Sequence, residues 1–411
     1  NFKRIYYKQM KILHDDRTTS ITATDPFNAT NFPIGNVQND KINSRYIPSA
    51  AIGGTTATVT ANFDGSASNK VQAFFVAGLM ADSATYSLQN ANGSSVIETG
   101  TLTTADLVNS DISGNKNTLN NYFVGQDNYT LSQFIVFANP QSADCRLVIT
   151  LTTSTDRKAQ TSNGQAIASW QKSSSTKGRF LDSAGAVVNL RDHGRVLVGS
   201  QVVIGGTAIA STITSDTTIS ANSVAVSPLT INASVTLTIA ASKSVTIVTS
   251  FPQISSYTGS GTAAGSVTLS SDLATQAVTS IINPIRVGIF RGGSVLDMPN
   301  PQIGLTNSLT DYSTRRTLTN GGYQYKQFNI GKTVGLSFIL TNAELQTFDN
   351  FVRAYRSKPF AGLFLPDMNS TQEPSTRYSG FYYLQEAPET SFDIGKTASN
   401  VSTSFTLNEI T

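Results

Sequence analysis

The sequence predicts a mainly β protein with one amphipathic helix, and three observations support this prediction. Short runs of alternating apolar and polar residues, bounded by Gly, Asn, Asp or Pro, recur along the chain. Charged residues make up only 13% of the sequence and aromatic residues 9%, so the surface must be polar without being ionic. The length of 411 residues exceeds what one ordinary domain needs. We therefore expect several β-rich domains in succession.

Residues 1–205 are predicted to form an antiparallel, jelly-roll-like β-sandwich. The clearest strand runs are 56–65, 71–80, 85–100 and 131–140. Each run contains β-branched or aromatic residues between turn residues, and the Asn-Ala-Asn-Gly-Ser-Ser stretch within 85–100 is a good hairpin turn. An antiparallel sandwich is the usual fold of such a pattern.

Residues 206–282 are predicted to be a Ser/Thr-rich β insertion. Ser and Thr alternate here with Val, Leu and Ile, and the only charged residues are Asp216, Lys243 and Asp272. So little apolar volume cannot offset the chain entropy of a normal globular core. We expect the segment to become ordered by stacking as strand rungs, in a solenoid or between subunits.

Residues 283–411 are predicted to form a β-rich α+β domain with a helix at 342–356. Strand runs stand at 332–340, 360–366 and 379–386. Thr341 and Glu344 have the spacing of a capping box, and Pro359 ends the helical pattern. The apolar face repeats at three- and four-residue spacing through Leu345, Phe348, Val352 and Tyr355. One helix packed on a β-sheet is the expected arrangement.

Charge and cysteine content argue against several classes of function. A net charge of +3 without a long basic run gives no electrostatic support for nucleic-acid binding. The single Cys145 lacks a partner for an internal disulfide or a thiolate metal site. No apolar run approaches the roughly 20 residues of a membrane span, and no apolar region follows the basic N-terminal stretch as in a signal peptide. We expect no nucleic-acid partner, no membrane insertion and no cofactor.

Candidate catalytic residues are few because the chain has two histidines. His14 is followed by Asp15 and Asp16, but adjacent strand residues point to opposite faces and do not converge on one ion. Asp192 and His193 lack the nucleophile turn that a hydrolase triad needs. The sequence therefore predicts no metal site and no catalytic residue.

A glycosidase is the alternative that the acidic residues leave open, since two carboxylates flanking a sugar ring would suffice for hydrolysis. Candidate carboxylates near the C-terminus are Asp367, Glu373, Glu386 and Glu389, with Tyr378, Tyr382 and Tyr383 close to them in sequence. Nothing in the sequence pairs the carboxylates. The tyrosines either stack on sugar or face a core, and in an alternating strand at least half should be core.

The C-terminal segment of roughly 130 residues resembles a region found in tail proteins of tailed bacteriophages. The residues that carry this resemblance are Gly288, Gly292, Asp311 to Ser313, Arg315, Arg316, Gly321, Gly322, the helix after Thr341, and Lys358-Pro359. The resemblance implies a structural component of a phage tail.

Two upstream segments resemble parts of such proteins. Residues 32–50, with the strands that follow, are similar to the start of discoidin-like, carbohydrate-binding-type jelly rolls, where Arg45-Tyr46 takes the place of an arginine or aromatic pair and the usual tryptophan is missing. The insertion is similar to short β-ladder segments of phage tail fibres. Its matching positions are Thr218-Ile219, Pro228, Thr230-Ile231, Val235 and Thr238-Ile239.

These resemblances imply a non-enzymatic virion protein at the tail tip or baseplate, assembled in the host cytoplasm. Its expected partners are other tail proteins, further copies of itself as a trimer or hexamer, and host-surface glycans. The ligand-contacting residues stay unassigned. The alternatives are a polysaccharide-degrading tail spike and a capsid or tail decoration protein without a receptor role.

Overall fold

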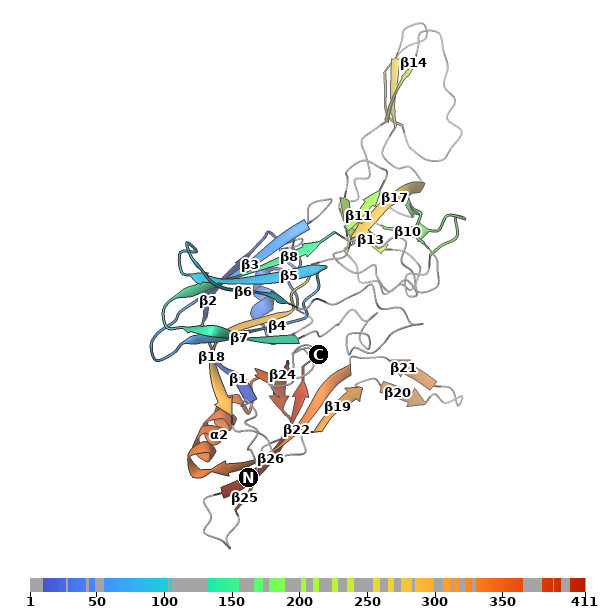
Figure 1. The fold of residues 1–411 in the computed structure, drawn as a ribbon. Helices are drawn as coiled ribbons and strands as arrows, with labels where there is room; N and C mark the ends of the chain where they lie inside the picture. The colour runs from blue at the N-terminus through green and yellow to red at the C-terminus, as the bar shows by residue number, and fades with distance from the viewer. Residues whose placement is uncertain are drawn as a thin grey trace, which may run out of the picture.

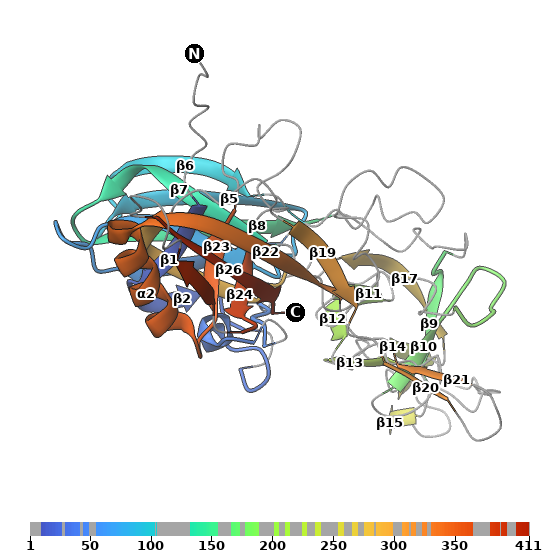
Figure 2. The same cartoon turned by 90° about the horizontal axis from the view of Figure 1, so that it is seen from below.

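A computed structural model shows that the protein is mainly β, as predicted, with one α-helix among the described residues. The structure describes residues 10–26, 29–41, 44–48, 55–102, 104, 132–154, 166–172, 177–188, 201–204, 210–213, 224–227, 235–239, 254–258, 265–269, 275–282, 285–298, 306–311, 314–317, 323–326, 330–364, 379–386, 388–392 and 400–410. Figures 1 and 2 show a compact body with a smaller barrel beside it, and Figure 1 shows a three-stranded unit beyond the barrel.

The body is organised around a ten-stranded antiparallel sheet that joins strands from both ends of the chain. In spatial order its strands are β19 (Thr306–Asp311), β22 (Ile330–Thr341), β26 (Asn400–Glu409), β24 (Ser379–Leu384), β23 (Phe360–Leu363), β1 (Met10–Asp16), β18 (Ile289–Met298), β4 (Val71–Ala77) and β7 (Ser132–Gln141), with β25 (Glu389–Phe392) beside β26. The early strand β1 lies between two late strands, because it pairs with β18 and with β23.

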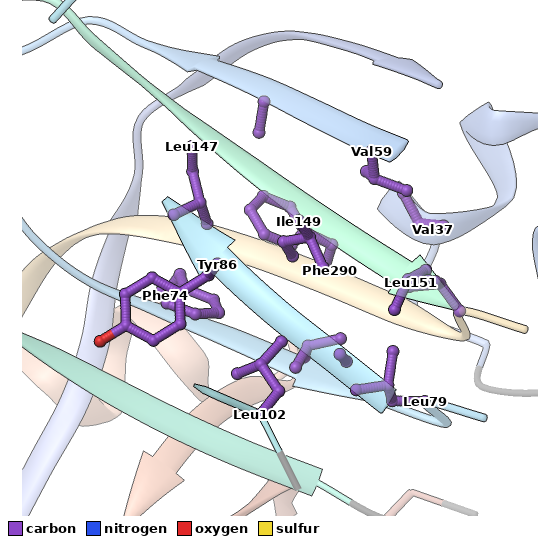
Figure 3. Packing of buried hydrophobic residues seen from close by; sticks show 14 of the residues in the cluster. Val37, Val59, Phe74, Leu79, Tyr86, Leu102, Leu147, Ile149, Leu151 and Phe290 are labelled. Carbon is purple, nitrogen blue, oxygen red and sulfur yellow. The ribbon is translucent and has the colours of Figure 1, made fainter. Parts of the chain in front are cut away.

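A five-stranded sheet packs against one part of this long sheet to form a β-sandwich. Its strands in spatial order are β2 (Thr18–Ala23), β3 (Thr55–Phe63), β8 (Cys145–Thr153), β5 (Ser83–Asn90) and β6 (Val96–Leu102). Alternate residues of β8 point inward, and Leu147, Ile149 and Leu151 meet Phe74 and Phe290 from the other sheet (Figure 3). The short 3-10 helix η1 (Ile34–Gln38) adds Val37 to this core.

The long sheet curls around a second core on its other face. Strand β4 is buried on both faces: Phe74 faces the sandwich core, while Phe75 faces the second core and stacks on Phe381 of β24 at 5.9 Å between ring centroids. Strand β7 lies beside β24, where Ser132 and Ser379 exchange hydrogen bonds. Each hydroxyl donates to the other residue's carbonyl, at 2.9 and 2.8 Å. These side chains therefore join the two sides of the curl.

A third core lies between the helix α2 (Asn342–Tyr355) and one face of strands β22 and β26. Its residues include Phe348 and Phe351, which contact Phe338 and Phe360. The predicted helix boundaries agree with the structure to one residue, and the predicted apolar face does pack on the sheet. The capping box is also present: Glu344 N–H donates to Thr341 Oγ1, and Thr341 N–H donates to Glu344 Oε2.

Removing this cap should weaken the third core without changing the fold. We expect Thr341→Ala to lower the free energy of unfolding by about 1 kcal/mol, because a backbone N–H of the first helical turn then lacks its acceptor. Urea unfolding checks this value. Thr341→Ser keeps the hydroxyl and should behave like the original protein, and equal losses in both variants would contradict the role of the cap.

Strands between residues 169 and 282 form a separate closed barrel and a small sheet. The barrel contains β9 (Ser169–Lys172), β10 (Lys177–Leu181), β11 (Gln201–Ile204), β12 (Ala210–Ile213), β13 (Val224–Ser227) and β17 (Thr275–Ile282). Trp170 and Phe180 of β9 and β10 are fully buried. Beyond the barrel, β14 (Val235–Ile239), β16 (Gly265–Leu269) and β15 (Ile254–Thr258) form a three-stranded sheet (Figure 1).

The sheets cross the domain boundaries predicted at residues 205 and 282. Strands β9 and β10 precede residue 205 but pair with β17 and β13 in the barrel. Strand β18 follows residue 282 but pairs with β1 and β4 of the body. Within one chain, the described strands of the insertion pair antiparallel with each other and with strands of the barrel, and stacking between subunits stays a prediction. The predicted boundaries differ from the sheets because alternation identifies a strand but not its hydrogen-bonding partner.

A two-stranded arm extends the β19–β22 pair away from the body. The pairing of Asp311 with Ile330 ends the sheet, and β20 (Thr314–Thr317) then pairs with β21 (Tyr323–Lys326) as a separate ribbon. Figures 1 and 2 show these strands beyond the ends of β19 and β22. We call β20 and β21 the arm.

Candidate functional site

The strongest candidate site is one face of the long sheet on strands β19, β22, β26 and β24. Strand alternation and the cross-strand register place its residues on the side opposite the apolar core under α2. We call this surface the hydroxyl face. Its described side chains are Thr306, Ser308, Thr333, Ser337, Ile339, Tyr383, Ser402, Ser404, Thr406 and Asn408. None of these side chains carries a charge, and the backbone register places Glu389 of β25 opposite Ser404 at the edge of the face.

The two faces of these strands differ sharply in composition. Even-numbered residues of β22, such as Leu336 and Phe338, are buried under α2, whereas Ser337 and Ile339 are exposed. The same alternation in β26 buries Phe405 and leaves its neighbour Ser404 exposed. Ser337, Ile339 and Ser404 are exposed, so no described element covers this part of the face.

Tyr383 stands at one end of the hydroxyl face in a fixed polar setting. Asn408 lies opposite Tyr383 on one side and opposite Thr333 on the other. Thr333 Oγ1 donates to Asn408 Oδ1 at 3.0 Å, and Asn408 Nδ2 donates to Tyr383 Oη at 3.5 Å. Tyr383 is 39% exposed. This end of the face therefore offers an accessible aromatic ring beside an oriented amide.

Four large apolar side chains of the described residues are exposed. Among the described residues they are Val96, Val136, Ile339 and Tyr383. Two of these four lie on the hydroxyl face, at opposite ends of it. Scattered apolar residues on a surface need no explanation, and what this pair adds is an aromatic ring and an aliphatic side chain at the two ends of a hydroxyl-rich face.

A buried polar cluster lies close to Tyr383, on the core side of the same strands. Lys332 and Glu409 are 5% and 2% exposed, and Lys332 Nζ lies 3.3 Å from Glu409 Oε1. Lys332 Nζ also donates to the Ser379 carbonyl at 2.7 Å, and the Lys332 backbone N–H donates to Glu409 Oε2 at 3.0 Å. Burial raises the pKa of Glu409, although the charge and hydrogen bonds of Lys332 oppose that rise.

The neighbouring Tyr382 belongs to the core. Its ring is fully buried, and its hydroxyl has no hydrogen-bond partner among the described residues. Burial raises the pKa of Tyr382, and the charge of Glu409 adds to this rise. Lys332, Glu409 and Tyr382 thus form a structural cluster where the curled sheet closes, next to the Ser132 and Ser379 pair.

The His14-Asp15-Asp16 stretch does not converge on one point. Asp15 Oδ2 lies 2.9 Å from Arg17 Nε, whereas Asp16 Oδ2 lies 3.6 Å from Arg291 Nε. The side chain of His14 is exposed, and its carbonyl accepts the hydroxyl of Tyr355. Burial, with the charges of Asp15 and Asp16, raises the pKa of Tyr355 to about 12. Each aspartate thus pairs with its own arginine.

Arg291 holds η1 against the sandwich. Its guanidinium donates to the Val37 and Gln38 carbonyls at 3.1 and 2.7 Å, and it lies 2.8 Å from Asp40 Oδ1. It also stands over the ring of Phe381 at 5.7 Å. The role of this arginine is therefore to fix a loop.

The other candidates from the sequence are dispersed. Glu386 is exposed, and Glu389 stands opposite Ser404 in the backbone register. Tyr46 is buried in the sandwich core, where its hydroxyl donates to the Thr24 carbonyl, so its ring cannot face a ligand. Cys145 is a buried free cysteine, and burial with the charge of Asp144 raises its pKa to about 11. The candidates outside the described residues are Asp192, His193, Asp367, Glu373 and Tyr378.

Within the described residues, the structure brings together no group of three or more His, Cys, Asp or Glu side chains that would hold a metal ion. In the same part of the chain, no helix combines the length and apolar character that a membrane crossing requires. Compared with models of known protein families and with curated protein sequences, the chain gives no match.

Proposed function

We propose that the chain is a non-enzymatic structural protein of a bacteriophage tail, located at the tail tip or baseplate, where it assembles with tail proteins and contacts the host surface. The resemblance of the C-terminal segment to tail proteins supports the proposal. The observation that carries it furthest is the arm, because a two-stranded ribbon outside any larger sheet is marginally stable by itself. Such a ribbon gains stability by packing on a partner.

The composition of the arm indicates the chemistry of that partner. Residues 314–326 contain Arg315, Arg316 and Lys326 and no acidic residue. The register places Arg315 opposite Tyr325 and Arg316 opposite Gln324. A basic, tyrosine-containing ribbon suits an acidic surface on a neighbouring subunit, since aromatic residues and arginine are enriched at protein interfaces. A closed ring of three or six copies would give every arm the same neighbour.

Removing the arm should separate assembly from folding. We expect a variant in which residues 312–329 are replaced by Asn-Gly, a dipeptide that forms tight hairpin turns, to unfold at the same temperature as the full chain. The full chain should form a closed trimer or hexamer in analytical ultracentrifugation, and the shortened chain should stay monomeric. A full chain that is monomeric at every concentration, or a shortened chain that still assembles, would contradict this role.

The rival function is a polysaccharide-degrading tail spike. Glu386 is exposed and precedes Glu389 by three residues in the sequence, and these two carboxylates keep the rival open because glycoside hydrolysis needs two. Purified protein incubated with capsular polysaccharide distinguishes the two functions. The proposal predicts polysaccharide of unchanged size in gel filtration, and progressive chain shortening would favour the spike.

A further inference from the structure

We propose that the hydroxyl face binds an uncharged polysaccharide chain, with Tyr383 as the ring on which one sugar stacks. This inference rests on the proposed contact with the host surface, and it assigns that contact to a particular set of residues. The sequence resemblance pointed to the N-terminal sandwich for glycan contact, whereas the hydroxyl face belongs to the C-terminal strands.

The lack of basic side chains among the described residues of the face sets the class of ligand. The described side chains of the hydroxyl face are Ser, Thr, Asn, Tyr and Ile. Acidic polysaccharides, phosphates and nucleic acids are held by arginine and lysine, and the described side chains of this face include neither. A neutral sugar needs hydroxyls and amides that both donate and accept hydrogen bonds, as Ser, Thr and Asn side chains do.

The ring of Tyr383 supplies the apolar contact that a sugar needs. A pyranose presents C–H groups on its flat faces, and an aromatic side chain with an apolar body and a polar tip can cover one of them. Phe381, two residues earlier on the same strand, is buried in the core of the curl. Tyr383 is thus the first aromatic side chain beyond that core, and it is 39% exposed.

The amide beside the ring is already oriented. Asn408 is held by Thr333 Oγ1 at 3.0 Å on one side and by Tyr383 Oη at 3.5 Å on the other. Binding therefore needs little further ordering of this side chain, which lowers the entropic cost of forming a complex. Its remaining hydrogen-bonding capacity lies next to the ring, where the hydroxyls of a stacked sugar would be.

The length of the face suits a linear chain of sugars. Tyr383 stands opposite Asn408, and Ile339 stands opposite Ser402. These two positions on β26 are separated by six residues, or about 20 Å at the rise of an antiparallel strand. Ser404 and Ser337 lie between them as a cross-strand pair. A polysaccharide could thus contact Tyr383, then hydroxyls, then Ile339.

A second copy of the chain is a less suitable occupant. Sheets that pack face to face interdigitate apolar side chains, and serine is depleted at protein interfaces. The hydroxyl face has the opposite composition, with Ile339 as its one exposed aliphatic side chain among the described residues. The binding experiment below therefore also follows the oligomeric state, which would reveal self-association through this face.

The test measures binding of the full chain to an array of neutral hexose oligomers, with oligomers of uronic acids as an acidic set. Bound oligomers are then titrated by calorimetry. We expect neutral oligomers to bind and acidic ones not to bind. Tyr383→Ala should weaken binding at least tenfold, whereas Tyr383→Phe should retain most of it. Val96→Ala, which shortens an exposed apolar residue on another sheet, should bind as the original protein does.

Three outcomes would overturn the proposal, provided that circular dichroism shows each variant folded. The first is that the full chain binds no neutral oligomer. The second is that the Tyr383→Ala variant binds neutral oligomers as tightly as the original protein. The third is that Tyr383→Ala changes the oligomeric state of the protein and leaves its glycan binding unchanged. None of these outcomes affects the proposed place of the protein in a phage tail, because that place is tested by microscopy of particles.

Discussion

Replacing Lys332 with methionine is expected to lower the free energy of unfolding by about 3–5 kcal/mol, because it leaves the carboxylate of Glu409 buried without its partner. Glu409 is 2% exposed, and both of its oxygens face Lys332. Urea unfolding at neutral pH measures the loss. The matched control is the double variant Lys332→Met with Glu409→Leu, which should recover most of the stability because no buried charge remains.

The same variant should show a distinctive pH dependence. Burial raises the pKa of Glu409, and Lys332 opposes the rise, so removing Lys332 raises the pKa of Glu409 further. A carboxyl whose pKa is higher in the folded state stabilises the fold at low pH and loses this contribution as the pH rises through the folded-state pKa. The loss in free energy of unfolding caused by Lys332→Met should thus shrink as the pH falls toward 4.5, the ordinary pKa of a glutamate side chain. A deficit that grows on acidification would contradict the account.

Truncating Phe290 should have an effect of similar size, although this residue lies beyond the insertion. We expect Phe290→Ala to lower the free energy of unfolding by about 3–5 kcal/mol, the usual cost of removing a buried aromatic ring. Phe290 is completely buried in the sandwich core and packs against Phe63 and Phe74, with ring centroids 6.2 and 6.3 Å apart. The variant tests whether β18 completes the N-terminal sandwich.

The control for this prediction is Val136→Ala, which shortens a residue that is 38% exposed on β7. This change should stay within about 0.5 kcal/mol of the original protein. Hydrogen exchange adds a local measurement, since opening of the core by Phe290→Ala should speed the exchange of amides in β3 and β8. A loss below about 1 kcal/mol, with protection of β3 and β8 unchanged, would mean that β18 is not part of that core.

Local patterns in the sequence were sufficient to predict several elements. The helix expected at 342–356 is Asn342–Tyr355, and its capping box is formed. The strand expected within 71–80 is Val71–Ala77. Both predictions depend on residues within a few positions of each other, where periodicity and capping act directly. The mainly β class followed from the same information.

The partners of these strands could not be predicted. The pairing of β1 with β18 brings residues nearly three hundred positions apart into one ladder. Gly293 permits this approach, because a Cβ atom at that position would lie 2.0 Å from the Asp15 carbonyl oxygen. The sequence has a glycine pair at this position, but it does not indicate that β1 is the strand that packs against it. The predicted boundaries at 205 and 282 therefore differ from the sheets observed.

The candidate site was predictable in part. An alternating strand implied that some of its tyrosines would be core, but the register with β26 decided which: Tyr382 opposite Glu409 is buried and Tyr383 opposite Asn408 is exposed. Lys332 has the same strand parity as the apolar Val334 and Leu336, which was a signal that its side chain points inward. Its pairing with Glu409, 77 positions away, had no signal in the sequence.

The central claim is that this chain is a component of a phage tail tip, and electron microscopy of labelled particles tests it most directly. Antibodies raised against the full chain, detected with gold, should bind at the end of the tail farthest from the head. The account predicts gold at that end in intact particles and none on heads or along the shaft. Gold on the head or along the shaft, or particles that lack the protein altogether, would contradict it.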